Sequence, residues 1–330
     1  MQSAIVRAIT PVDPLQPESV RSDPVFSSPP LAPGALRGKT VVITGASDGI
    51  GRALAESCAQ AEAHVVMVGR NTAKTTHAAS MVMNRTGSRL VSVETADLLF
   101  LEEQAALVAR LRAAHPTLFA LVNNAGALFL EREETRDGLE RTFALNHVAY
   151  VTLALGLLPS LYAGAKDGDP ARIVNIASRA HVAASIDFND LQSARGYSGW
   201  SVYGRSKLAN ILFTSALARR VDSSRISVNA VHPGLVASRF ASNNGAMGRL
   251  QRRVMNWFSV SASAGADTAA WLLASREGAQ HTGAYWVCRT RTEPSAAAQD
   301  MHVADELLRT TCALAGLSDE LPRAPEESTT

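Results

Sequence analysis

The chain has 330 residues, of which 46% are hydrophobic and 19% are charged. This composition provides enough apolar side chains for one large folded domain and excludes a globally disordered chain. The formal net charge of +2 gives no electrostatic basis for binding nucleic acid.

Residues 1–36 are rich in proline and contain no apolar run of the kind found in a signal peptide. Because proline disfavours both helix and sheet, this segment is predicted to be a disordered extension. Its prolines are Pro11, Pro14, Pro17, Pro24, Pro29, Pro30 and Pro33.

The longest apolar stretch, residues 149–161, is too short to span a bilayer and is predicted to be a buried helix. Cys58, Cys288 and Cys312 are odd in number and lack the spacing of a metal-binding pair, so they predict no disulfide framework and favour a reducing compartment. These features predict a cytoplasmic protein without a membrane span.

From Lys39 onward, short apolar runs alternate with segments of helical spacing. The runs are predicted to be strands, at residues 39–44, 64–69, 89–94, 118–123, 172–177 and 225–231. The helices are predicted at residues 50–61, 101–114, 138–158, 200–220 and 264–275. Such alternation is typical of a parallel sheet covered on both faces. We therefore predict an α/β fold, a single doubly wound Rossmann-type domain over residues 37–317 with a mostly parallel seven-stranded sheet, and a flexible tail at 318–330.

Glycines follow the first predicted strand in a pattern that suits phosphate binding. Gly45 permits a tight turn, Gly49 lets the backbone approach a pyrophosphate, and Gly51 lets the helix pack close to the strand. Because the pattern lies between a strand and a helix, we interpret it as a nucleotide site rather than a merely structural turn. The contacts with the cofactor predicted in this turn are Gly45, Ser47, Asp48, Gly49, Ile50 and Gly51.

Arg70 follows the second predicted strand, where an NAD-dependent enzyme usually carries a carboxylate for the ribose 2′-hydroxyl. Its guanidinium would instead pair with a 2′-phosphate, which favours NADP(H) as the cofactor. The alternative is a solvated arginine at the end of a strand.

The next two strand ends also carry predicted cofactor contacts. Asp97 is expected to accept a hydrogen bond from the adenine amino group, and the alternative is that it caps the following helix. After the fourth strand, small residues let the cofactor lie close, and the amide of Asn123 is expected to tie neighbouring strands together. The predicted contacts here are Asp97, Leu98, Asn124, Ala125 and Gly126.

Tyr203 and Lys207 are four residues apart on a predicted helix, so their side chains project from one face. Reduction of a carbonyl needs a proton donor as hydride arrives, and a tyrosine can serve if its pKa of about 10 is lowered. A lysine cation ~4–5 Å away is expected to supply part of that lowering, and an oxidised nicotinamide the rest. Lys207 could also hold the hydroxyls of the nicotinamide ribose.

Ser178 and Asn146 complete the predicted catalytic set. Ser178 ends a predicted strand, and its hydroxyl is expected to hydrogen-bond the substrate oxygen and orient it. Asn146 lies inside a predicted helix, where asparagine is unfavourable. We expect a water held on its exposed amide or on its backbone carbonyl to link Lys207 to solvent as a proton relay. The alternative for Asn146 is an ordinary buried polar residue.

Taken together, these motifs resemble those of the short-chain dehydrogenase/reductase family, in the family's order. They are the glycine turn at 44–51, Asn-Asn-Ala-Gly at 123–126, Ser178, the pair Tyr203 and Lys207, and His-Pro-Gly at 232–234. Within the family, the chain looks most like the retinol dehydrogenase-like branch. The long spacing from Ser178 to Tyr203, the stretch after Tyr203 and the C-terminal end suggest this branch.

The resemblance implies an NADP(H)-dependent alcohol dehydrogenase or carbonyl reductase with Ser178, Tyr203, Lys207 and Asn146 as its catalytic residues. It adds cofactor contacts at Pro233, Gly234, Val236 and Ser238, the last two on the nicotinamide carboxamide, and a homodimer or homotetramer. Three features depart from the branch: Ser238 stands where threonine is usual, Ala177 where a serine often precedes the catalytic one, and a proline-rich segment where membrane-bound relatives carry an apolar anchor. The last of these puts retinol itself in doubt as the substrate.

By family position, residues 238–261 form a lid over the substrate. Its apolar residues predict an apolar pocket, and therefore a hydrophobic ketone, aldehyde or alcohol as the substrate. They are Phe240, Met247, Leu250, Met255, Trp257 and Phe258. One alternative is ordinary packing of an amphipathic helix, and another is weak contact of Arg249, Arg252 and Arg253 with a membrane surface.

Two other functions remain open from the sequence. One is a catalytically inert NADP(H)-sensing or scaffold protein built on the same fold. The other is a nucleotide-sugar epimerase, which uses the same triad but usually needs a larger C-terminal substrate domain.

Overall fold

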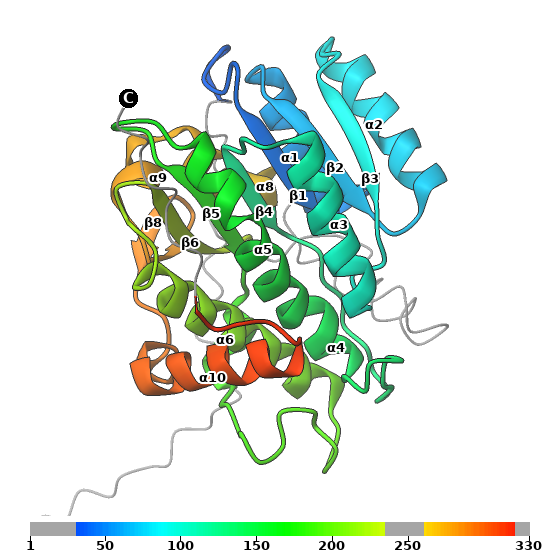
Figure 1. Cartoon of the computed structure of the whole chain (residues 1–330), viewed down its shortest axis with the longest axis vertical. Coiled ribbons are helices and arrows are strands. Elements are labelled where there is room, and N and C mark those ends of the chain that lie inside the picture. Colours follow the sequence, from blue (N-terminus) through cyan, green and yellow to red (C-terminus); the bar gives the residue numbers. More distant parts are fainter. Residues whose placement is uncertain (1–30, 235–260, 321–330) are drawn as a thin grey trace, which may run out of the picture.

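The structure is a computed structural model that describes residues 31–234 and 261–320. A single sheet of eight strands runs through its centre, in the order β3-β2-β1-β4-β5-β6-β7-β8 (Figure 1). The strands are β1 (Thr40–Thr44), β2 (His64–Gly69), β3 (Val91–Thr95), β4 (Ala120–Asn123), β5 (Ala171–Ile176), β6 (Ile226–His232), β7 (Tyr285–Val287) and β8 (Thr290–Thr292). Strands β1 to β7 pair in parallel, and β8 pairs antiparallel with β7. The predicted single α/β domain with a mostly parallel sheet is confirmed.

The sheet has one strand more than the seven we predicted, because the chain turns back directly after β7. Cys288 and Arg289 form this turn with φ angles of 49° and 59°, in the left-handed region that usually requires glycine or asparagine. Neither cysteine nor arginine is typical of such a turn, so the sequence did not indicate a hairpin here. The turn is held instead by Arg289, whose guanidinium donates to Asp267 and whose N–H donates to Thr268 Oγ1 at 3.1 Å.

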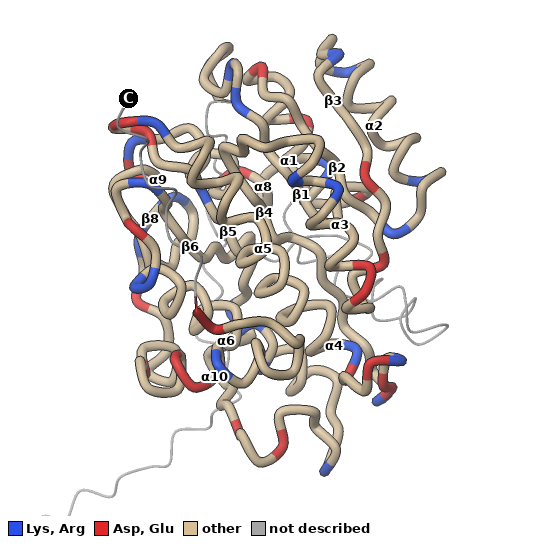
Figure 2. Tube along the Cα trace, viewed as in Figure 1, with Lys and Arg blue, Asp and Glu red and all other residues tan. Residues whose placement is uncertain are grey.

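Helices cover both faces of the sheet (Figure 1). One face packs against α1 (Gly49–Gln60), α2 (Thr72–Thr86) and α8 (Ala262–Ala274). The other packs against α3 (Leu101–Ala114), α5 (Ala149–Gly164) and α6 (Gly199–Ala218), and α10 (Met301–Leu314) lies along α6. Because alternate strand residues point to opposite faces, Val41 and Ile43 pack on the face covered by α1, α2 and α8. Val42 packs on the face covered by α3, α5 and α6. Strands β1, β2 and β4 carry no Lys, Arg, Asp or Glu, whereas the helices and loops around the sheet carry many charged side chains (Figure 2).

The predicted helices omit α2 and α10. Helix α2 begins after Asn71, whose side chain accepts a hydrogen bond from Lys74 N, and it ends at Gly87 with a φ of 73°. Its buried residues include Thr75 and Ala78, which are too small to give a clear hydrophobic period. The smaller helical elements are α4 (Arg141–Phe143), η1 (Ala144–Val148), η2 (Arg179–Ala183), α9 (Arg276–Gln280) and η4 (Ala296–Gln299).

The three elements α4, η1 and α5 form one continuous helix, Arg141–Gly164. By length and composition alone it could cross a membrane, but most of it is buried inside the protein, including Tyr150, Leu153 and Leu157. The prediction of a buried helix here is confirmed. At the other end of the chain, residues 31–36 fall within the predicted extension, yet Leu36 is fully buried in the core beside α1.

Candidate functional site

The carboxyl ends of β1 and β4 lie side by side at the point where the chain changes direction across the sheet. Ligands of doubly wound sheets bind at such a point. Here Thr44 Oγ1 accepts hydrogen bonds from Asn124 N at 2.9 Å and Ala125 N at 3.0 Å, and the Asn124 amide donates to Thr44 O at 2.8 Å. These bonds fix the loop after β4 against the loop after β1.

The loop after β1 has a shape that requires glycine. Gly45 has a φ of 66°, and a Cβ atom on it would lie 2.9 Å from Ala125 Cα. A Cβ atom on Gly51 would lie 2.5 Å from Gly45 O, so α1 can approach β1 only because that atom is missing. Gly49 has a φ of 51°, and its N–H donates to the capping Asp48 side chain at 2.9 Å. The loop therefore turns the N-terminus of α1 toward the point between β1 and β4 where the chain changes direction, and this arrangement suits a pyrophosphate.

Arg70 is exposed directly after β2, at the same edge of the sheet as this loop. A second cation, which we did not predict, is Lys74, whose Nζ lies 3.2 Å from Asp48 Oδ2 in the glycine turn. The Asn71 cap could have revealed it, because a cap three residues earlier places Lys74 in the first turn of α2, at the same edge of the sheet. Two positive side chains therefore lie where a 2′-phosphate is expected.

The predicted residues after β3 and β4 lie at the edge of the sheet, and one alternative role, that of Asp97 as a helix cap, is excluded. Helix α3 has Phe100 at its N-cap position, so the alternative role of Asp97 as that cap is wrong. Asp97 Oδ1 instead accepts from Leu99 N at 3.2 Å, within the loop at the sheet edge. The expected tie between strands is present, because Asn123 Nδ2 donates to Asn175 Oδ1 of β5 at 2.9 Å.

Tyr203, Lys207 and Ser178 are brought together at the carboxyl end of β5. Both Tyr203 and Lys207 are buried on α6, and Lys207 Nζ lies 5.6 Å from the centre of the Tyr203 ring. Ser178 begins the turn η2, where its hydroxyl accepts from Ala180 N at 3.2 Å, and its side chain is hydrogen-bonded to Tyr203. Lys207 Nζ also donates to Ile176 O at 3.0 Å, which holds the ammonium between β5 and α6.

Asn146 lies beside Lys207, but its amide is not exposed as we expected. It sits in the π-helical turn η1, is fully buried, and its side chain accepts from Ala127 N and donates to Ala127 O and Ser206 Oγ. A Cβ atom on Gly126 would lie 3.1 Å from Asn146 Oδ1 and 3.5 Å from Lys207 Nζ, so both polar groups face the same glycine. The expectation of a water on the amide is therefore wrong, because the amide holds the loop after β4 instead. Water on the backbone carbonyl stays a prediction.

The protonation of Tyr203 and Lys207 is governed by their burial. The expected lowering of the Tyr203 pKa depends on the lysine and an oxidised nicotinamide together, and it stays a prediction. In the protein without cofactor, burial raises the pKa of Tyr203 above its ordinary value, and the hydrogen bond with Ser178 lowers it by less. Burial lowers the pKa of Lys207 to about 7. Burial therefore favours the neutral form of Tyr203, which holds its proton at neutral pH, and it leaves Lys207 divided between its charged and neutral forms near pH 7.

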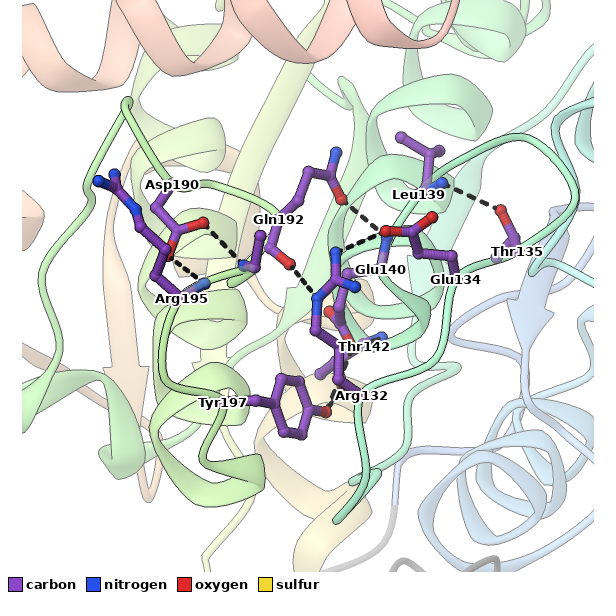
Figure 3. A network of polar contacts seen from close by, with 11 residues as sticks. Arg132, Glu134, Thr135, Leu139, Glu140, Thr142, Asp190, Gln192, Arg195 and Tyr197 are labelled. Carbon is purple, nitrogen blue, oxygen red and sulfur yellow. Dashed lines mark hydrogen bonds and ion pairs between the residues drawn. The ribbon is translucent and has the colours of Figure 1, made fainter.

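The long segment between Ser178 and Tyr203 is fastened to the segment before η1 by a polar network (Figure 3). Gln192 accepts from Glu140 N at 2.7 Å through its side chain and from Arg132 Nε at 3.2 Å through its backbone carbonyl. The Tyr197 hydroxyl donates to Phe129 O at 2.9 Å and lies 3.3 Å from Glu140 Oε1. Glu140, which we did not single out, is fully buried, and its carboxylate caps α4 by accepting from the N–H groups of two following residues.

Part of the predicted set falls outside the described residues. Pro233 and Gly234 directly follow β6, and Gly234 has a φ of 79°. Residues 235–260 are not described, so Val236, Ser238 and most of the predicted lid stay predictions. That lid includes Phe240, Met247, Leu250, Met255, Trp257 and Phe258, and the arginines Arg249, Arg252 and Arg253.

Comparison with known proteins gives a consistent result. The model of the family described as short chain dehydrogenase matches residues 39–248. Retinol dehydrogenase 12 of Mus musculus is 35% identical over 285 residues, covering 86% of this chain and 89% of the relative. Retinol dehydrogenase 13 of Homo sapiens is 33% identical over 298 residues, covering 88% of each.

Solved structures agree with these relatives. An uncharacterized protein from Mycobacterium Paratuberculosis has a TM-score of 0.69 at 28% identity, covering 87% of this chain and 96% of that one. The Pseudomonas aeruginosa RhlG/NADP active-site complex has a TM-score of 0.62 at 25% identity, covering 81% of this chain and 100% of that one.

Proposed function

Because this chain belongs to the short chain dehydrogenase family of oxidoreductases, we propose that it interconverts an apolar ketone or aldehyde and the corresponding alcohol with NADP(H). Tyr203 is the proton donor and acceptor, Ser178 orients the substrate oxygen, and Lys207 holds the cofactor ribose and supports the tyrosine. The observation that carries this proposal is the cluster of the three side chains at the carboxyl end of β5, where Ser178 is hydrogen-bonded to Tyr203 and Lys207 lies one helical turn from Tyr203.

The protonated state of Tyr203 suits carbonyl reduction. The nicotinamide supplies the hydride when the cofactor is bound. Tyr203 holds a proton at neutral pH and can donate it to the carbonyl oxygen, while the Ser178 hydroxyl donates a second hydrogen bond to the same oxygen. Lys207, on the next turn of α6, is placed to stabilise the tyrosinate that remains.

NADP(H) is proposed over NAD(H) because of charge. Arg70 and Lys74 lie at the end of β2 and the start of α2, where a 2′-phosphate would be neutralised. The similar RhlG protein is a complex with NADP in its solved structure, which supports the same cofactor here.

An apolar substrate is proposed because of two exposed side chains. Trp200 lies three residues before Tyr203, is 43% exposed, and stands edge-on to the Tyr203 ring at 6.4 Å. Val182 lies in η2, four residues after Ser178, and is 60% exposed. Large apolar side chains exposed on both catalytic elements favour an apolar substrate near them.

The test follows NADPH absorbance with a panel of apolar ketones and aldehydes, using wild type and Tyr203→Phe. We expect wild type to turn over at least one member, and the variant to lose ~100-fold or more in kcat while it still binds NADPH. Full activity in Tyr203→Phe would refute the mechanism. Cofactor binding without turnover of any substrate by wild type would favour the sensing function.

A further inference from the structure

His181 lies in the turn η2, three residues after Ser178, and only 1% of its surface is exposed. Its Nδ1 atom lies 2.7 Å from the carbonyl oxygen of Ser178. Its Nε2 atom lies 3.2 Å from the backbone nitrogen of Ser295, 114 residues later in the sequence. Ser295 precedes η4, which leads into α10. One imidazole therefore joins the turn that carries Ser178 to the C-terminal part of the fold.

The two partners require one protonation state of this ring. A backbone N–H can only donate, so Nε2 must be the acceptor toward Ser295. A carbonyl oxygen can only accept, so Nδ1 must carry the hydrogen that points at Ser178. Both contacts form together only in the neutral ring with its hydrogen on Nδ1. A second hydrogen, on Nε2, would face the N–H of Ser295 and break that contact.

The surroundings of His181 favour the neutral ring. Burial lowers the pKa of His181 from its ordinary 6.5, the hydrogen bond with the Ser178 carbonyl raises it by less, and the nearby Arg179 guanidinium lowers it again. On β6, His232 lies close by, and burial lowers its own pKa to about 4. On β7, the Tyr285 ring stands edge-on to His181 at 5.1 Å, and burial raises the pKa of its hydroxyl to about 12. Neither His232 nor Tyr285 is therefore charged near neutral pH, and Arg179 opposes a positive ring.

We propose that His181 is a positioning residue that, in its neutral form, ties the Ser178 turn to Ser295 and so holds the Ser178 hydroxyl toward Tyr203. The proposal rests on the proposed function. Helix α6 packs against the same turn from the side that carries Tyr203. The turn is thus held between α6 and the segment at Ser295, and loss of the imidazole releases one of the two sides.

Two variants separate the two contacts of the ring. In His181→Gln, the amide oxygen can take the place of Nε2 and accept from Ser295. In His181→Asn, the shorter amide can take the place of Nδ1 and donate to the Ser178 carbonyl, but it cannot reach Ser295. We expect kcat to fall ~10-fold or more in His181→Asn and to be largely restored in His181→Gln, with the KM for NADPH within about twofold in both.

The pH profile provides a readout that a merely structural role would not move. In wild type, kcat should fall as the pH drops below 6.5 toward the lowered pKa of His181, because protonation breaks the contact with Ser295. His181→Gln does not titrate, so this decline should be absent. The exposed His302 on α10 provides the matched control, since His302→Gln should keep the wild-type profile.

Nitrogen NMR of the imidazole reports the tautomer without any turnover, and we expect hydrogen on Nδ1 at pH 7.5. A ring with hydrogen on Nε2, or wild-type kcat in His181→Asn, would overturn the proposal. If wild type turned over no substrate, the proposed function would fail. The NMR result would still decide whether His181 forms the tie to Ser295.

Discussion

Gly204 lies so close to the backbone of Ala180 that a Cβ atom on it would be 2.7 Å from the Ala180 carbonyl oxygen. Gly204 directly follows Tyr203 on α6, and Ala180 lies two residues after Ser178. The contact between glycine and carbonyl therefore sets the separation of the two elements that carry the tyrosine and the serine.

Gly204→Ala is predicted to lower kcat by ~10- to 100-fold, because the added methyl group pushes α6 away from η2 and lengthens the contact between Tyr203 and Ser178. Steady-state kinetics with the best substrate of the panel would measure this. Ser201→Ala, an exposed change on the same helix, should leave kcat near the wild-type value. Equal activity in the Gly204 variant would mean that the helix can shift without consequence.

Lys207→Met is predicted to change the pH dependence of stability. The pKa of Lys207 is lowered from its ordinary 10.5 to about 7 in the folded protein, so its contribution to stability is fully present above 10.5 and declines as the pH falls toward 7. Methionine has no such dependence. The free energy of unfolding of the variant, relative to wild type, should therefore be a few kcal/mol higher at pH 7 than at pH 10. Denaturant unfolding at several pH values measures this, and a constant difference would contradict it.

Much of this fold and site could be predicted from the sequence, because the signals are local. Strands such as β1 and β6 are buried on both faces and read as continuous apolar runs, and the glycine turn combines three backbone requirements within seven residues. In the same way, the end of a predicted strand indicated Ser178, and helical spacing indicated the pair Tyr203 and Lys207.

What could not be predicted depends on long-range contacts or on unusual local geometry. The contact of His181 with Ser295 joins positions 114 residues apart, and no period in the sequence reveals it. The strand β8 depends on Cys288 in the left-handed region, which the sequence pattern of an ordinary hairpin does not include. The burial of Asn146 depends on the π-helical turn, which re-aims its amide toward Ala127.

Arg70→Asp is predicted to lower the preference for NADPH over NADH by ~10- to 100-fold, because a carboxylate would repel the 2′-phosphate that the guanidinium attracts. The ratio of kcat/KM for the two cofactors measures the effect. Arg85→Gln, at the far end of α2 and paired with Glu56, is the matched control and should leave the ratio unchanged. A wild-type protein that already prefers NADH would refute the assignment of Arg70.

Trp200→Ala is predicted to raise the KM for apolar substrates by ~10-fold, since a large exposed ring beside Tyr203 would lose its contact area with the substrate. The change in kcat should be smaller, because Tyr203 keeps its bond with Ser178. Met301→Ala removes a similarly exposed apolar side chain from α10 and should leave KM unchanged. An equal rise in KM for apolar and polar carbonyl compounds would contradict a role in substrate choice.

Glu140→Ala is predicted to lower the free energy of unfolding by about 2–4 kcal/mol, because the N–H groups of Thr142 and Phe143 would lose their carboxylate acceptor inside the protein. Glu140→Gln keeps one acceptor oxygen and should lose roughly half as much. Urea unfolding measures both, and Glu131→Ala at an exposed position nearby should have little effect. Losses no larger than that of the control would show that the cap contributes nothing to stability.

The same carboxylate gives a second, pH-dependent result. Burial raises the pKa of Glu140 above its ordinary 4.5, more than its hydrogen bonds lower it. The stability it contributes is therefore greatest below pH 4.5 and declines as the pH rises through the raised value. Glutamine does not titrate, so the stability of Glu140→Gln relative to wild type should increase between pH 4.5 and pH 7. If that difference were the same at both pH values, burial would not govern the ionisation of this group, and Glu140 would behave as a solvated carboxylate despite its place in the network with Gln192 and Tyr197.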